Sequence, residues 1–193
     1  MKIIFDFDDV IFDTQSFKQK VFSGLNSCGV DSEVVKGLYG SHRRLFNPSS
    51  IYRDVVVISG KNISEEKVNE AIDNLFQDIG KYIDKRITDI IYSTGKDNCF
   101  ILTAGDEDFQ RLKIQNSLDK SVINNEHVIF VKDNKDSKVK EICEKYPNES
   151  IIFVDDKNEH INEVAALNLK NLYPILYNKD GFDILSSKIR ELS

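Results

Sequence analysis

A regular alternation of short apolar runs with helical patterns over residues 98–193 constrains the fold of this chain most strongly. The runs are rich in β-branched and aromatic residues and lack polar alternation, which is typical of strands buried on both faces. Strands that alternate with helices pair in parallel and are joined by right-handed crossovers. The expected strands are 99–102, 127–131, 150–154 and 172–176, and the expected helices are 107–117, 136–146, 158–167 and 182–190.

A further strand is expected at the beginning of the chain, where Ile3, Ile4 and Phe5 are followed directly by acids. Asp6 and Asp8 are two residues apart, so in an extended chain their side chains point to the same side. Carboxylates held this close repel each other unless a cation or a shared proton lies between them, and oxygen ligands of this kind favour Mg²⁺. The simpler alternative is an acidic turn after an edge strand, because Asp is common in turns.

The segment between this strand and the others is mostly helical in pattern. Ser64 is expected to cap a long helix whose apolar stripe continues to Ile90, with a bend or break at Gly80. Residues 51–58 fit either a strand, by propensity, or a helix. Residues 40–50 are expected to form a loop.

A helical block of this size is too long to be a simple connection inside a compact domain, so we expect an inserted subdomain. The predicted organisation is an α/β core of residues 1–13 and 95–193 with an inserted helical cap of residues 14–94.

Composition and charge bear on the partners of the chain. The net charge is −6 and no block is rich in lysine or arginine, so nucleic acid is not expected as a partner. The apolar runs are too short to span a membrane and the N-terminus has no signal-peptide layout, so no membrane partner is expected. Cys28, Cys99 and Cys143 are odd in number and widely spaced, which fits reduced thiols in a cytoplasmic protein. A monomer or weak homodimer is expected.

The polar residues of the α/β part fall at one edge of the predicted sheet. Ligands of an open α/β sheet bind outside the carboxyl ends of the strands, at a switch point. In the strand order 3-2-1-4-5, the first and fourth strands are neighbours there. Acids, a hydroxyl and an ammonium then converge, a set that suits a Mg²⁺-bound phosphate. These residues are Asp6, Asp8, Thr103, Lys135, Asp155 and Asp156.

With these residues the sequence resembles the haloacid dehalogenase (HAD) superfamily, in its phosphatase-like branch with a helical cap of the first insertion type. The resemblance implies a Rossmann-like, parallel five-stranded sheet. Residues 3–10 match the first motif of the family, a hydrophobic strand followed by DxDx(T/V). Thr103 matches the second motif, Lys135 the third, and Asp155 with Asp156 the fourth. All four occur in order, each at an expected strand end or helix start.

The resemblance implies a Mg²⁺-dependent phosphomonoester hydrolase that acts on a small phosphorylated metabolite through an aspartyl-phosphate. Asp6 would be the nucleophile and Asp8 the general acid. The metal ligands would come from Asp6, Asp8 (through its main-chain carbonyl), Asp156 and Asp155; which of the last two contacts the metal directly stays open. Thr103, Ala104 and Lys135 would bind the phosphoryl oxygens, with Lys138 as a rival to Lys135.

Other functions of the same architecture remain open. A phosphomutase or phosphotransferase would pass the phosphoryl group to a sugar hydroxyl instead of water, and a catalytically silent relative would bind phosphate only. A signalling receiver module is disfavoured, because in receivers the acid pair and the phosphorylated Asp precede the Thr and the Lys, whereas here an acid pair, Asp155 with Asp156, comes last.

Three positions depart from the family pattern. Asp9 stands where glycine is usual, and His160 where a further acid often occurs. Asp136 follows Lys135 in place of proline. We expect His127 and His160 to be structural or surface residues.

Overall fold

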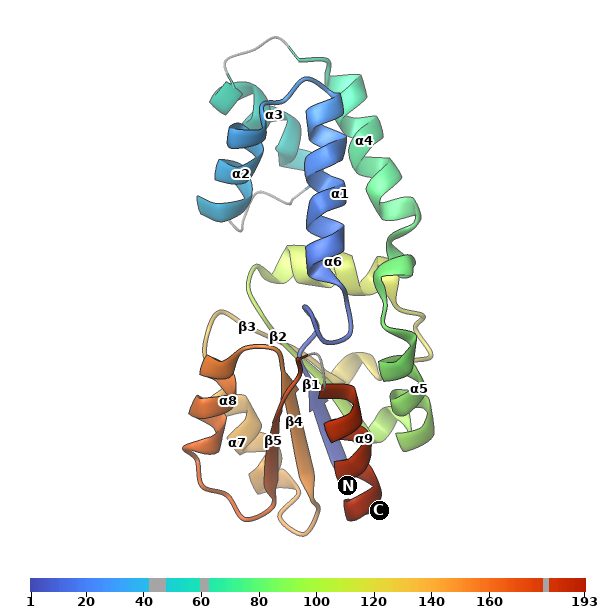
Figure 1. The fold of residues 1–193 in the computed structure, drawn as a ribbon, viewed down its shortest axis with the longest axis vertical. Helices are drawn as coiled ribbons and strands as arrows, with labels where there is room; N and C mark the ends of the chain where they lie inside the picture. Colours follow the sequence, from blue (N-terminus) through green and yellow to red (C-terminus); the bar gives the residue numbers. More distant parts are fainter. Residues whose placement is uncertain (42–47, 60–62, 179–180) are drawn as a thin grey trace. The chain divides into compact units, whose positions relative to one another are not determined.

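The computed structural model describes residues 1–41, 48–59, 63–178 and 181–193. The chain forms two compact units, which we call the α/β unit and the helical unit (Figure 1). The α/β unit comprises Met1–Asp13, Asp84–Gly105 and Asp119–Ser193. The helical unit comprises Thr14–Ile83 and Asp106–Leu118.

A five-stranded parallel sheet forms the centre of the α/β unit, in the order β3-β2-β1-β4-β5 (Figure 1). This confirms the predicted fold class and strand order. The central strand β1 is buried along its whole length, which is why its sequence lacks polar alternation. The strands are β1 (Lys2–Phe5), β2 (Cys99–Ala104), β3 (Val128–Val131), β4 (Ile151–Asp155) and β5 (Leu172–Leu176).

Alternate residues of the central strands face opposite sides of the sheet, and helices cover both sides. Ile4, Phe100 and Phe153 pack in one apolar cluster with residues of α7 and α8. In Figure 1, α5 and α9 cover the opposite side of the sheet, and each contributes fully buried side chains such as Ile91 and Leu185. The helices of this unit are α5 (Lys85–Thr94), η3 (Lys96–Asn98), η4 (Asn125–His127), α7 (Asp136–Lys145), α8 (Asn158–Ala165) and α9 (Gly181–Leu192).

The helical unit packs around apolar residues that recur at helical spacing. The Phe17 ring meets the rings of Phe76 and Tyr82 edge-on, at centroid distances of 6.1 and 5.6 Å. Ser64 caps α4 as predicted, because its side chain accepts a hydrogen bond from the Lys67 N–H. The helices of this unit are α1 (Thr14–Ser27), α2 (Ser32–Ser41), α3 (Pro48–Ser59), α4 (Glu65–Gln77), η2 (Ile79–Tyr82) and α6 (Glu107–Ser117).

The structure decides several points that the sequence left open. Residues 51–58 are helical, within α3. The long helix expected after Ser64 is interrupted: α4 ends at Gln77, and α5 begins anew after Asp84, whose side chain accepts from the Arg86 N–H. Of the loop expected at 40–50, residues 42–47 lie outside the described residues, and the expectation is wrong for residues 40–41 and 48–50, which are helical in α2 and α3.

The division into units differs in extent from the predicted insertion of residues 14–94. Helix α5 groups with the α/β unit, since the Asp84 N–H that precedes it donates to the Ile11 carbonyl. Helix α6, which follows β2 in sequence, groups with the helical unit and packs against η2. A cap function of the insertion stays a prediction.

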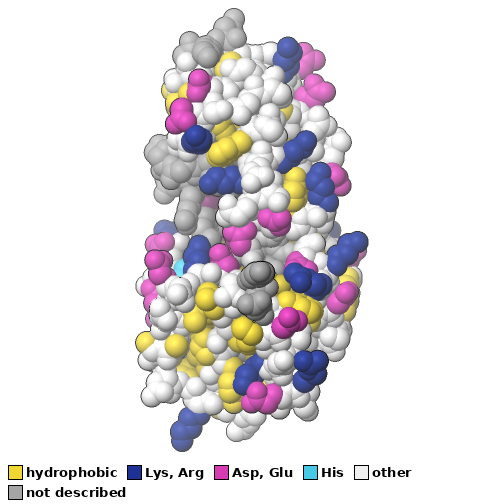
Figure 2. Space-filling view, viewed as in Figure 1, with side chains coloured by type: hydrophobic (Ala, Val, Ile, Leu, Met, Phe, Trp, Pro, Cys, Tyr) yellow, Lys and Arg dark blue, Asp and Glu magenta, His cyan; other side chains and the backbone are white. Residues whose placement is uncertain are grey.

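Charged side chains of both signs are interspersed over the face drawn in Figure 2. Among the described residues, no helix is both long enough and apolar enough to cross a membrane.

We expect Ile4→Ala to lower the free energy of unfolding by about 2–5 kcal/mol, because it opens a cavity in the middle of the sheet. Ile4 has 0% exposure, whereas Ile184 on α9 is 50% exposed. Urea denaturation followed by circular dichroism measures the change. Ile184→Ala serves as the matched control and should stay within about 0.5 kcal/mol of wild type. Equal losses in the two variants would contradict the burial of β1.

Candidate functional site

The sheet register brings the acids of the first and fourth strands together. Phe5 of β1 pairs with Val154 of β4, so Asp6 and Asp155 follow neighbouring strands at the same level. The Asp6 N–H donates to the Val154 carbonyl at 2.8 Å and extends this pairing by one residue. Both carboxylates lie in the interior, with residue exposures of 3% for Asp6 and 0% for Asp155.

Lys135 joins the two acids. It precedes α7, and its ammonium Nζ lies 2.8 Å from Asp6 Oδ1 and 2.7 Å from Asp155 Oδ2. The lysine is 1% exposed, so all three groups are removed from bulk water. Its rival Lys138 instead pairs with Glu141 at 2.8 Å and has a side chain that is 39% exposed. The structure therefore brings Lys135, and not Lys138, to the acids.

Burial dominates the electrostatics of this group. Desolvation raises the pKa of Asp6 from 3.8 to about 7, against the opposing effect of Lys135 and with further increases from the charges of Asp155 and Asp8. Burial alone would lower the pKa of Lys135, but its two carboxylate partners outweigh that effect and raise it. Lys135 is thus held in its charged form. Its single positive charge does not offset the cost of burying an ionised Asp6 carboxylate.

Asp156 completes a cluster of three carboxylates. One carboxylate oxygen from each of Asp6, Asp155 and Asp156 lies within 4.8 Å of the others. Asp156 Oδ1 is buried and has no hydrogen-bond partner among the described residues. Burial, followed by the charge of Asp155, raises the pKa of Asp156.

The chemistry of this donor set fits a divalent cation. The cluster holds three carboxylates against the one ammonium of Lys135, so negative charge is in excess. A buried carboxylate oxygen without a partner is costly unless a cation or a donor satisfies it. Hard oxygen ligands of this kind suit Mg²⁺. The residues present could therefore hold that ion.

Thr103 and Ala104 lie at the carboxyl end of β2, the other neighbour of β1. Thr103 is 1% exposed, and its Oγ1 is buried without a hydrogen-bond partner among the described residues. The chain turns immediately afterwards, where the Gly105 N–H donates to the Val131 carbonyl at 3.0 Å. A hydroxyl and a strand end thus lie at the edge that carries the acids, although phosphate binding by Thr103 and Ala104 stays a prediction.

Asp8 lies in a tight turn after β1 and is half-buried. The turn is closed by hydrogen bonds from the Ile11 and Phe12 N–H groups to the Phe7 carbonyl and by stacking of the Phe7 and Phe12 rings at 5.2 Å. Asp8 is near enough for its charge to raise the pKa of Asp6. Its carboxylate is not one of the three in the cluster found among the described residues, so its predicted part in metal binding is untested.

Asp9 explains one departure from the family pattern. Its φ of 56° lies in the left-handed region that glycine adopts most easily. Asp tolerates this conformation better than most residues. The turn therefore forms without the usual glycine, and its geometry is locked by the Asp9 N–H, which donates to the Phe12 carbonyl at 2.7 Å.

His160 contacts the acid cluster, although its sequence context predicts a structural or surface residue. Its Nδ1 lies 3.1 Å from Asp155 Oδ1 and 3.0 Å from Asp155 Oδ2. The only sequence signal was its position, five residues after Asp155, where the family often has a further acid. His127, by contrast, contacts the Cys99 carbonyl and stacks on Phe100, as a structural residue does.

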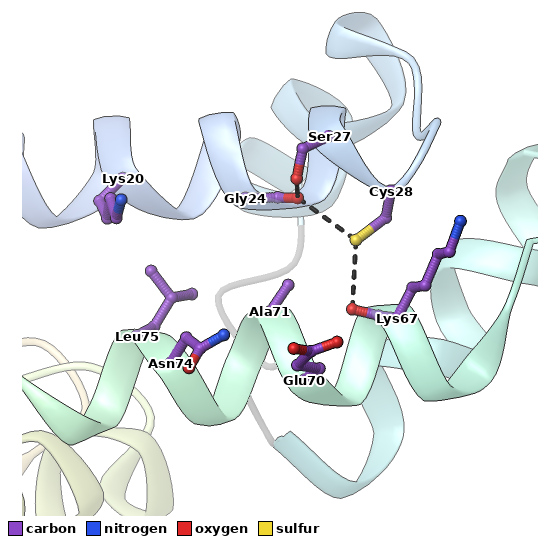
Figure 3. A pocket seen from close by; sticks show the side chains of 9 residues that line it. All are labelled: Lys20, Gly24, Ser27, Cys28, Lys67, Glu70, Ala71, Asn74 and Leu75. Carbon is purple, nitrogen blue, oxygen red and sulfur yellow. Dashed lines mark hydrogen bonds between the residues drawn. The ribbon is translucent and has the colours of Figure 1, made fainter.

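The helical unit has a groove of its own, of about 430 Å³, between α1 and α4 (Figure 3). The helices approach closely at small residues: a Cβ on Gly24 would lie 3.9 Å from that of Ala71. Cys28 Sγ donates to the Gly24 and Lys67 carbonyls. The lining combines small residues with charges of both signs and does not gather one kind of functional group. The acid cluster does, and it is therefore the candidate functional site. The full lining is Lys20, Gly24, Ser27, Cys28, Lys67, Glu70, Ala71, Asn74 and Leu75.

Comparison with solved structures finds proteins of the same fold, whereas comparison of sequences finds no relative. No protein-family model and no curated protein sequence matches the chain. A haloacid dehalogenase-like hydrolase of Burkholderia xenovorans aligns over 99% of this chain and 90% of its own, with a TM-score of 0.65 and 15% identity. A haloacid dehalogenase-like family hydrolase of Xanthomonas campestris aligns over 100% and 96%, with a TM-score of 0.60 and 10% identity.

A third solved structure carries ligands. It is a HAD family enzyme of Bacteroides thetaiotaomicron in complex with magnesium and inorganic phosphate, which aligns over 92% of this chain and 93% of its own, with a TM-score of 0.54 and 12% identity. At these identities the likeness establishes the fold alone. The fold is that of the haloacid dehalogenase-like hydrolases.

The raised pKa of Asp6 predicts a stability effect that depends on pH. Between pH 3.8 and about 7 the folded state retains a proton that the unfolded state has released, so the free energy of unfolding falls as pH rises through this window. Asp6→Asn mimics the protonated carboxyl. In EDTA at pH 8 we expect it to raise the melting temperature by about 2 °C or more, a gain that shrinks towards pH 4.

Thermal melts of both proteins from pH 4 to 8 measure this difference. Asp183→Asn, which removes an exposed acid of α9 in the same unit, controls for the loss of one negative charge. A gain that is the same at every pH, or equal in the two variants, would contradict the titration of Asp6 as its cause.

Proposed function

We propose that this chain is a HAD-type phosphoric monoester hydrolase that uses Mg²⁺ and acts on a small phosphorylated metabolite. One observation carries the proposal: buried Lys135 contacts both Asp6 and Asp155, with the carboxylate of Asp156 beside them. The fold supports it, and so does the Bacteroides enzyme of the same fold, which is a complex with magnesium and inorganic phosphate. As part of the same proposal, the helical insertion is the cap subdomain.

Asp6 is assigned as the nucleophile, and its contacts indicate which oxygen reacts. The hydrogen bonds that the structure shows for its carboxylate, from Lys135 Nζ at 2.8 Å and from the Phe7 N–H at 2.7 Å, both fall on Oδ1. Oδ2 is therefore the oxygen that attacks phosphorus. As the new bond forms, the bond from phosphorus to the ester oxygen breaks, and Asp8 donates a proton to that oxygen.

The resulting aspartyl-phosphate divides one difficult hydrolysis into two easier steps. In the second step Asp8, now ionised, accepts a proton from a water whose oxygen attacks phosphorus. The bond between phosphorus and Asp6 Oδ2 then breaks, which releases inorganic phosphate and restores the carboxylate. Asp8 ends the cycle protonated, ready for the next ester.

Charge neutralisation is the main requirement of this chemistry, because a carboxylate and a phosphate dianion repel each other. Lys135 supplies one positive charge at Asp6, and its contacts with two acids keep it in place. The hydroxyl of Thr103, buried and without a partner among the described residues, is available to donate to a phosphoryl oxygen. When bound by Asp6 and Asp156, Mg²⁺ would add charge neutralisation at the phosphoryl oxygens.

Hydrolysis of p-nitrophenyl phosphate tests the proposal. We expect slow Mg²⁺-dependent turnover that EDTA abolishes and that Asp6→Asn lowers by at least about 1,000-fold, because the variant lacks the attacking oxygen. Release of p-nitrophenol is followed at 405 nm, with Asp183→Asn as an acid-loss control that should retain activity. Turnover that survives Asp6→Asn would refute the nucleophile. If neither this substrate nor a panel of natural phosphomonoesters is hydrolysed by wild type, the hydrolase is refuted, which leaves a phosphotransferase or a silent, phosphate-binding member of the fold.

The two lysines give a second test with a built-in control. Lys135→Met leaves Asp6 and Asp155 buried without their shared cation, so we expect the free energy of unfolding to fall by about 3–5 kcal/mol. The value of kcat/KM should fall by at least about 100-fold. Lys138→Met removes the same charge from the surface and should change stability by less than about 0.5 kcal/mol. Loss of activity in Lys138→Met alone would make Lys138 the phosphate-binding lysine.

A further inference from the structure

Asp155 is held by three donors, one from the start of α7 and two from the N-terminal end of α8. Lys135 Nζ donates to Oδ2 at 2.7 Å, and the Lys157 N–H donates to Oδ1 at 2.9 Å. His160 Nδ1 lies 3.0–3.1 Å from both oxygens. With 0% exposure for its side chain, Asp155 obtains these contacts in place of water.

The His160 contact requires a hydrogen on Nδ1, because the oxygens of an ionised carboxylate only accept. His160 lies in the first turn of α8, immediately after the strand that carries Asp155, so the contact spans a short and ordered stretch of chain. Its side chain is 14% exposed, whereas the side chains of Lys135 and Asp155 are 1% and 0% exposed. The ring is therefore partly accessible to solvent, while the carboxylate that it contacts is not.

This contact limits how Asp155 can rotate. The terminal torsion of an Asp side chain is broad, so a carboxylate held by fewer donors can turn about its axis. In the observed orientation Oδ2 meets Lys135, and the same ammonium reaches Asp6. Rotation of Asp155 would loosen Lys135 and with it the position of the proposed nucleophile.

We infer that His160 is a positioning residue, which fixes the Asp155 carboxylate so that Lys135 stays against Asp6. The carboxylate oxygens of Asp155 are thereby occupied by donors of the protein itself. Asp156, whose buried Oδ1 has no partner among the described residues, is then the carboxylate that faces the metal. This inference rests on the proposed function, since it assigns His160 to the site that binds Mg²⁺ and phosphate.

Three substitutions at one position test the geometry. The amide nitrogen of His160→Asn can take the place of Nδ1, whereas that of His160→Gln lies one bond further out, and His160→Ala has no donor. His160 acts on Asp6, a proposed metal ligand, through Asp155 and Lys135. Groups behind metal ligands typically alter metal affinity by 10–100-fold. We therefore expect the Ala and Gln variants to bind Mg²⁺ at least about 10-fold more weakly than wild type, and the Asn variant to bind it nearly normally.

Affinity is obtained by fitting the rise of melting temperature with Mg²⁺ concentration c, because the stabilisation grows as RT ln(1 + c/Kd); this readout needs no turnover. The value of kcat/KM for p-nitrophenyl phosphate at saturating Mg²⁺ is measured in parallel and should fall in the Ala and Gln variants. His127→Asn is the matched control: His127 contacts a backbone carbonyl and Phe100 in the same unit, so its loss should leave Mg²⁺ affinity unchanged.

The outcomes separate this inference from the proposed function. Wild-type Mg²⁺ affinity in the Ala variant, or equal weakening in the Asn and Gln variants, overturns the positioning role while hydrolysis by wild type stands. The expected affinities without hydrolysis of any phosphoester support the positioning role and refute the hydrolase. If wild type shows no Mg²⁺-dependent stabilisation, both fall. Should the Ala variant fail to fold, the comparison of Asn with Gln decides.

Discussion

The contact of one buried ammonium with two buried carboxylates is the interaction on which the rest of this site depends. Lys135 connects the ends of β1 and β4 to the start of α7, so three separate parts of the chain meet at one charge. A buried ion pair is seldom a net source of stability, because the cost of removing charges from water offsets most of the attraction. Its value here lies in specificity: an apolar replacement could fill the space but could not hold Asp6 in one orientation.

The same cluster has an excess of negative charge that the ammonium of Lys135 does not neutralise. The cluster has three carboxylates, of which Lys135 contacts two, and burial raises the pKa of Asp6 to about 7. A protein selected for stability alone would replace one of these acids with an apolar residue. Strain of this kind is concentrated at functional sites, where a ligand relieves it on binding. The imbalance is thus the physical link between the fold and the cation that we propose.

The sequence predicted the sheet well because its signals are local. Apolar runs that end in acids or a hydroxyl indicated the strands. The order 3-2-1-4-5 is an assumption that agrees with the resemblance to the haloacid dehalogenase superfamily, since the rule of right-handed parallel connections allows other orders as well. The sequence predicted less where packing decides. The run from Val55 to Ile58 has strand propensity but is helical, and Val55 is fully buried. The contact of His160 with Asp155 depends on how the first turn of α8 is oriented, which no residue pattern shows.

The position of β1 has a consequence for how the protein is made. This strand lies at the centre of the sheet, yet its partners are strands that begin at Cys99 and Ile151. Pairings so distant in sequence form slowly, because a long loop must close before any contact is gained. During synthesis Asp6 is made before Lys135 and Asp155, so its carboxylate lacks these neighbours until both have been added. The strand that bears the proposed nucleophile therefore lacks both neighbours while the helical insertion is made, and its apolar residues are exposed to other chains during that time.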